Sequence, residues 1–157
     1  MESWSSALRH SVLSGGAASL ASTAVLAARS AIENGTPYAP TNATSHWLWG
    51  ERAAHQDTPS LRYTALGYAT HHASAMIWAA VYEKLFGDRA RRGDAAIALA
   101  GGLAVSALAC FVDYQLTPER LQPGYERRLS KRSLWMVYGV LGLAMAAPAL
   151  FGSRSRD

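Results

Sequence analysis

The sequence predicts an all-α fold, an integral membrane four-helix bundle, in a single transmembrane domain that covers residues 1–157. The main observation is how charge is distributed. Hydrophobic residues make up 50% of the chain and charged residues 17%, and the charged ones cluster between four long uncharged windows. Each window approaches or exceeds the roughly 18 residues that a bilayer-spanning helix needs. The windows are 11–28, 63–82, 95–112 and 133–153, and they predict spans at about 11–31, 62–84, 94–116 and 133–152.

The first window needs a decision between a span and a secretory signal peptide, because Arg9 and His10 precede an apolar run. The apolar region of a signal peptide has about 7–15 residues and ends at a small-residue cleavage site. The window is longer, and residues 27–31 match such a site poorly, so we expect a retained span. Its Gly15 and Ser19 share one helical face with Ser22, which predicts close helix packing.

Two adjacent histidines, His71 and His72, lie in the middle of the second window. Titratable groups at bilayer depth are costly and usually face the interior of a bundle, where they pack or form a site. Helical phase separates the two residues. His71 belongs to an inward stripe with Tyr68, whereas His72 is rotated by about 100° onto the next row.

A second row of small and polar residues in the third span, formed by Gly102, Ser106, Cys110 and Asp113, is also expected to face inward. Asp113 and Arg29 lie near the ends of their spans on the same side of the membrane, so we expect an ion pair between them, with Arg62 as the competing partner. His71 lies roughly 13 Å deeper than Arg62 at 1.5 Å per residue, so contact with Asp113 is not expected. The predicted polar cluster is His71, His72, Asp113, Arg29 and Tyr68.

The connection between the first two spans breaks helix at residues 35–40, which include a glycine and two prolines. Thr41 or Asn42 can cap a short amphipathic helix that runs to about residue 54. Trp47 and Trp49 indicate that this helix lies at the membrane interface, in preference to a substrate lid.

The chain is basic, with 15 Lys plus Arg against 11 Asp plus Glu. The cations lie in the connections and tails, where lipid headgroups are the expected contact, so we expect anionic lipids as partners and no nucleic acid. The predicted headgroup ligands are Arg89, Arg91, Arg92, Arg127 and Arg128.

Three function classes fit these features, and the favoured one is a structural or accessory membrane protein, without a cofactor, whose buried polar groups hold helices together. Because a structural or accessory protein is favoured, we do not expect the protein to be an enzyme. One alternative is a proton or small-solute path through His71 and Asp113, which needs a homo-oligomer because four short helices are few for a carrier. The other is a membrane-embedded protein or enzyme that binds a transition metal or haem. Its candidate ligands are His71, His72, His46 and His55, although no HExxH or CxxC motif is present.

The last connection carries a resemblance to a known group of proteins. Residues 113–130, DYQLTPERLQPGYERRLS, are followed by Val137 and Tyr138. This string resembles uncharacterised small four-helix inner-membrane proteins of bacteria, and the Gly-rich first span and the Ala39-Pro40 loop are loosely similar to the YagU-like group. The resemblance implies a bacterial inner-membrane location and the four-helix architecture, and it implies no catalytic residues.

Overall fold

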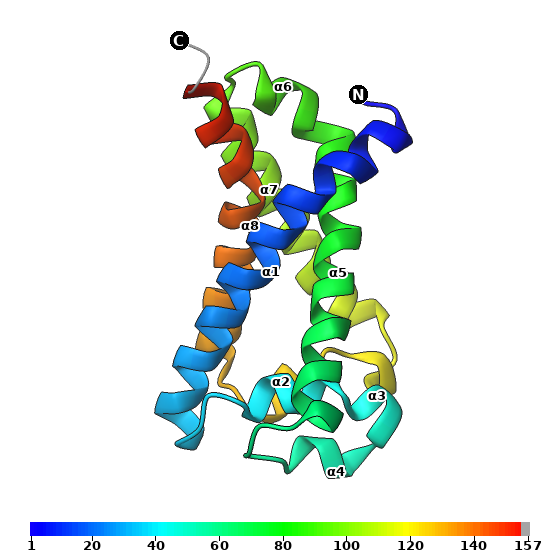
Figure 1. Cartoon of the computed structure of the whole chain (residues 1–157), viewed down its shortest axis with the longest axis vertical. Coiled ribbons are helices and arrows are strands. Elements are labelled where there is room, and N and C mark those ends of the chain that lie inside the picture. Colours follow the sequence, from blue (N-terminus) through cyan, green and yellow to red (C-terminus); the bar gives the residue numbers. More distant parts are fainter. Residues whose placement is uncertain (155–157) are drawn as a thin grey trace.

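The structure is a computed structural model that describes residues 1–154, with side chains as far as residue 152. It is all-helical: 83% of the chain is helix, and the described residues contain no strand (Figure 1). The all-α prediction is confirmed.

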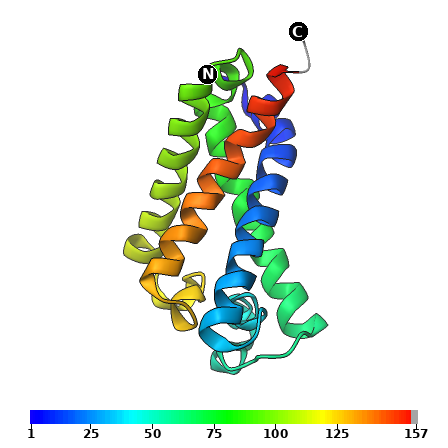
Figure 2. The ribbon, with the colours of Figure 1, turned by 90° about the vertical axis from the view of Figure 1, so that its left-hand side faces the viewer.

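Four long helices lie side by side, and short helical turns close the two ends (Figures 1 and 2). The long helices are α1 (Trp4–Asn34), α5 (Leu66–Tyr82), α7 (Ala95–Phe111) and α8 (Lys131–Arg154). The short ones are α2 (Ala39–Thr44), α3 (His46–Trp49), α4 (Glu51–Ala54) and α6 (Asp88–Arg91). π-Helical turns extend α5 and α7 at Leu61–Ala65, Glu83–Gly87 and Val112–Leu116, and 3₁₀ turns form at Glu119–Leu121 and Tyr125–Arg127.

Three segments are long and apolar enough to cross a membrane: Trp4–Asn34, Ala95–Leu116 and Lys131–Gly152. They agree with the predicted first, third and fourth spans. The predicted second span, 62–84, is not among them, and its α-helical part, α5, has 17 residues. The cause lies in its composition, because the histidines and tyrosines that give this helix its polar stripe also lower its mean hydropathy.

The long helices meet through small side chains, as the first span predicts. α1 packs against α5 and α8, and α7 packs against α8 (Figure 2). Gly15 and Ser19 are buried in α1. At the α7–α8 contact, a Cβ on Gly102 would lie 2.2 Å from the carbonyl oxygen of Gly142, so only glycine allows this approach.

The first connection forms three short helices, α2, α3 and α4, in place of the single short helix that its sequence predicts, and a position at the membrane interface stays a prediction. α2 begins at Ala39, and residues 39–46 are buried against α1 and α5. Asn42 is fully buried and does not act as a cap: its amide donates to the carbonyl oxygens of Gln56 and Thr58, both at 3.0 Å, and accepts from the Thr64 hydroxyl at 2.6 Å. Since its side chain binds the returning chain, α2 is held inward.

Trp47 and Trp49, the expected interfacial anchors, are each a little over one-third exposed. Their indole N–H groups donate to the carbonyl oxygens of Gln122 and Arg62, at 2.9 and 3.0 Å. Both tryptophans therefore tie α3 to neighbouring segments.

Gly67 gives a direct test of how closely α2 packs on α5. A Cβ at this position would lie 1.8 Å from the carbonyl oxygen of Thr41. We expect Gly67→Ala to lower the free energy of unfolding by about 1–3 kcal/mol through overpacking. Gly16→Ala is the matched control, since its Cβ meets nothing within 4 Å, and it should stabilise α1 by about 0.5–1 kcal/mol. Thermal unfolding in nonionic detergent, followed by circular dichroism, measures both; equal midpoints for the two variants would contradict the packing.

Candidate functional site

A cavity of about 230 Å³ lies between α5, α7, α8 and the connection that precedes α8. It collects polar residues that are far apart in the sequence, and aromatic side chains form part of its walls. The polar lining consists of Thr44, Thr70, His71, Ser74, Asp113 and Thr117, and the aromatic lining of Trp47, Trp78, Tyr125 and Tyr138. Two of the residues predicted as a polar cluster, His71 and Asp113, thus line one cavity.

His71 is buried at the centre of a hydrogen-bonded chain that joins three parts of the protein. Its Nε2 lies 2.8 Å from the Ser22 hydroxyl of α1, and its Nδ1 lies 2.6 Å from the Tyr125 hydroxyl. The Ser22 hydroxyl donates its hydrogen to the carbonyl oxygen of Ala18, at 2.7 Å, and must therefore accept from His71. We therefore assign His71 as the neutral Nε2–H tautomer, in which Tyr125 donates to Nδ1.

Tyr125 reaches His71 because of the turn before it. Gly124 has φ +88°, and a Cβ there would lie 2.9 Å from the carbonyl oxygen of Ala43, so the conformation and the space both require glycine. Tyr125 is only 4% exposed. Burial raises the pKa of its hydroxyl well above the usual value, and the carboxylates of Asp113 and Glu126 raise it further. The hydroxyl therefore stays protonated and remains a donor at neutral pH.

Asp113 lies in the π-helical turn that extends α7, and its Oδ2 accepts from the Tyr138 hydroxyl of α8 at 2.6 Å. The ion pair with Arg29 that the sequence predicts does not form. Arg29 binds Glu33, one turn along α1, at 3.0 Å and the Ser133 hydroxyl at 2.7 Å. Arg62, the competing partner, lies over the Trp49 ring at 4.2 Å. Asp113 thus has a neutral partner in the structure.

The other predicted histidines do not join His71 at one point. The His72 ring lies 5.8 Å from the Tyr68 ring, and its buried Nδ1 has no hydrogen-bond partner among the described residues. His46 is buried, with Nδ1 2.8 Å from the carbonyl oxygen of Ala43, and His55 is exposed. The structure therefore brings one histidine of the four to the cavity.

The five arginines expected to bind lipid headgroups each have an acidic partner within the chain. Arg89 pairs with Asp94, Arg91 with Glu2 and Glu83, Arg92 with Asp88, Arg127 with Glu51, and Arg128 with Asp57. A lipid phosphate would compete with these carboxylates, and the binding of anionic lipid stays a prediction.

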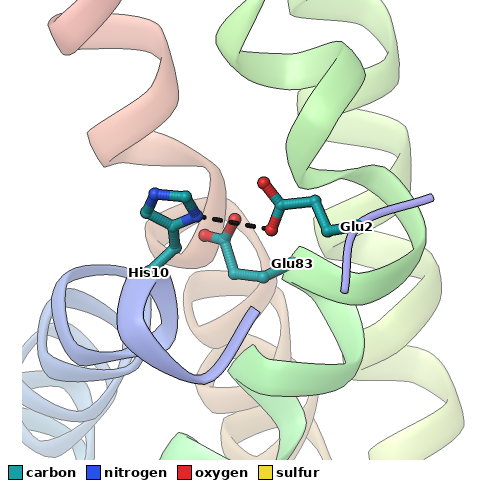
Figure 3. Close-up of side chains that lie close together, drawn as sticks. All are labelled: Glu2, His10 and Glu83. Carbon is teal, nitrogen blue, oxygen red and sulfur yellow. Dashed lines mark hydrogen bonds and ion pairs between the residues drawn. The ribbon is translucent and has the colours of Figure 1, made fainter. Parts of the chain in front are cut away.

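A second cluster lies at the opposite end of the protein, where Glu2, His10 and Glu83 place their ligand atoms within 4.8 Å of one another (Figure 3). Within the described part of the chain it is the one group of three or more such residues with this spacing. The His10 Nδ1 lies 3.3 Å from the Glu2 carboxylate. Arg91 forms ion pairs with both carboxylates and so supplies the positive charge that a metal ion would bring. We interpret the cluster as an ion-pair network that fixes the start of α1.

Sequence reasoning missed Tyr125, Tyr138 and Glu83 as members of these sites. The Pro123-Gly124 dipeptide gives one available signal, since it predicts a turn that redirects the next side chain. Which partner that side chain meets depends on how the connection folds over α5, and helical periodicity does not describe this.

Comparisons with protein-family models, with curated proteins and with solved structures give no match to this chain.

The tautomer of His71 is open to direct measurement. In ¹⁵N-labelled protein we expect the two ring nitrogens of His71 to differ as in neutral Nε2–H imidazole. Tyr125→Phe leaves Nδ1 without its donor and should lower the free energy of unfolding by about 1–3 kcal/mol. Tyr38→Phe is the control, because the Tyr38 hydroxyl makes no hydrogen bond in the described structure. The assignment is wrong if the Nδ1–H form is observed or if both variants unfold alike.

Proposed function

We propose that this chain is an accessory integral membrane protein with four crossing helices, and that its interior cavity binds a small organic molecule. The observation that carries the proposal is the cavity itself, whose lining combines apolar and aromatic side chains with a few hydrogen-bonding groups. This combination is typical of ligand sites, which lie between the helices of bundles and fix a ligand with a few polar groups.

The size of the cavity limits the ligand to a small molecule. An engineered cavity of about 150 Å³ in another protein binds benzene. A cavity of about 230 Å³ therefore accommodates a single ring with a small substituent. A haem is far too large for this space.

The hydrogen-bond pattern favours binding over reaction. Both ring nitrogens of His71 are engaged, by Ser22 and Tyr125, so general-base chemistry or metal ligation at His71 would first have to break this chain. Its role in the proposal is to position the Tyr125 hydroxyl at the cavity.

Membrane insertion of all four long helices is part of the proposal. Three of them are long and apolar enough, and α5 would cross with its polar stripe turned toward α1 and the cavity. The location in a bacterial inner membrane is supported by the resemblance in residues 113–130. Self-association into a homo-oligomer stays a prediction.

The test measures ligand binding without assuming which ligand is natural. Purified protein in nonionic detergent is unfolded thermally in the presence of neutral, anionic and cationic single-ring compounds. A compound that binds the cavity raises the midpoint as its concentration rises. We expect at least one compound to stabilise the wild type and none to stabilise Ser74→Trp, which fills the cavity.

Ala73→Trp is the matched control, because it adds the same side chain to the exposed neighbouring position of α5 and should keep the response. If Ser74→Trp does not fold, Ser74→Leu blocks the cavity with a smaller change. The proposal fails if no compound stabilises the wild type, or if the blocked variant responds as the wild type does.

A further inference from the structure

We infer that the cavity selects a small organic ammonium cation with a flat apolar body. This inference rests on the proposed function and adds the chemical class of the ligand. Three features of the lining support it: an unbalanced carboxylate, a surplus of hydrogen-bond acceptors, and aromatic walls.

The first feature is the charge of the lining. Asp113 is its one carboxylate, and the described residues that line the cavity include no lysine or arginine. The hydrogen-bond partner of Asp113 is the neutral Tyr138 hydroxyl, which leaves the other carboxylate oxygen without an assigned bond. The two arginines expected to balance this charge are engaged elsewhere, Arg29 with Glu33 and Arg62 with Trp49. A cationic ligand would supply the missing charge, and an anionic ligand would be repelled.

The second feature is that most lining donors have already given their hydrogens to protein acceptors. The hydroxyls of Thr44, Thr70 and Thr117 donate to the carbonyl oxygens of Pro40, Leu66 and Val112, at 3.1, 3.0 and 2.9 Å. Tyr125 and Tyr138 donate to His71 and Asp113. These five groups therefore have no hydrogen left to donate to a ligand and can act toward it only as acceptors.

Two donors in the lining stay uncommitted among the described residues, the Ser74 hydroxyl and the Trp78 indole. Against the five acceptors and the carboxylate they are the minority. A ligand rich in acceptors would place its own lone pairs against the acceptor oxygens of the lining, which is unfavourable. An ammonium group instead offers these oxygens a positive charge and, where it has N–H groups, hydrogen-bond donors.

The third feature is aromatic. Trp47, Trp78 and Tyr125 line the cavity, and the electron-rich face of such rings attracts a cation. The same surfaces pack against a flat apolar body. They do not coordinate a metal ion, and because both nitrogens of His71 are engaged, too few ligands remain for one. The lining is therefore suited to an organic cation.

The experiment compares two ligands of the same shape that differ in charge, phenyltrimethylammonium and tert-butylbenzene. Binding to the full chain is measured by the shift in thermal midpoint and by tryptophan fluorescence, in maltoside detergent, whose headgroup carries no ammonium. The Ser74→Trp variant corrects for partition into micelles. We expect the cation to bind at least tenfold more tightly than the neutral compound.

Asp113→Asn keeps an oxygen that accepts from Tyr138 but removes the charge. It should reduce affinity for the cation at least tenfold and leave affinity for tert-butylbenzene unchanged. Glu119→Gln is the control, since it removes an exposed carboxylate from the connection that follows the Asp113 turn and should change neither value. The wild-type comparison stands without either variant if Asp113→Asn does not fold.

The outcomes separate this inference from the proposed function. If both compounds bind the wild type equally, or if the neutral one or benzenesulfonate binds more tightly, the cavity is a binding site and the charge assignment is wrong. If no compound binds, both are wrong. Tighter binding of the cation that survives in Asp113→Asn overturns the role of Asp113.

Discussion

The hydrogen-bonded chain from Ser22 through His71 to Tyr125 is the interaction on which the rest of the site depends. It links α1, α5 and the connection before α8, which are separated by 49 and 54 residues in sequence. A buried polar group without a partner costs free energy, so each of the three side chains holds the other two in place. Tyr125 thereby fixes the connection over the end of α5, and this connection forms one wall of the cavity.

Close backbone contacts allow the hydrogen bonds between Ser22, His71 and Tyr125 to form. α2 lies against α5 only because Gly67 leaves room for the carbonyl oxygen of Thr41. The connection before α8 lies against α2 only because Gly124 leaves room for the carbonyl oxygen of Ala43. α2 thus packs against α5 at Gly67 and against the turn before Tyr125 at Gly124. Its Asn42 then binds the returning chain at Gln56 and Thr58, so the first connection becomes part of the packed interior.

The sequence predicted the features that depend on helix periodicity and length. Long uncharged windows predicted four spans, and three of them are membrane-capable helices in the structure. Helical phase predicted that His71 faces inward while His72 does not share its contacts. It did not predict Tyr125 as the partner, because that contact depends on the path of a connection and not on a repeat. Arg29 pairs with Glu33 and not with Asp113 as expected. Glu33 is four residues from Arg29 on the same helix, where opposite charges meet with little loss of entropy. The expected depth of a residue in the membrane therefore predicted which end of the helices it lies at, and did not predict which side chain it pairs with.

The two ends of the protein differ in how their carboxylates are paired, and this contrast is the strongest physical reason to place a ligand at one of them. Glu83 is buried with Arg91 as its ion-pair partner, and Arg91 also pairs with Glu2, so each of these carboxylates has a cationic partner within the chain. Asp113 has only the Tyr138 hydroxyl. A phenol stabilises a carboxylate by a hydrogen bond but supplies no countercharge, and in apolar surroundings an unmatched charge is costly. A cationic ligand would supply Asp113 with the countercharge that Arg91 supplies to Glu83, and the cavity beside Asp113 is large enough to receive such a ligand.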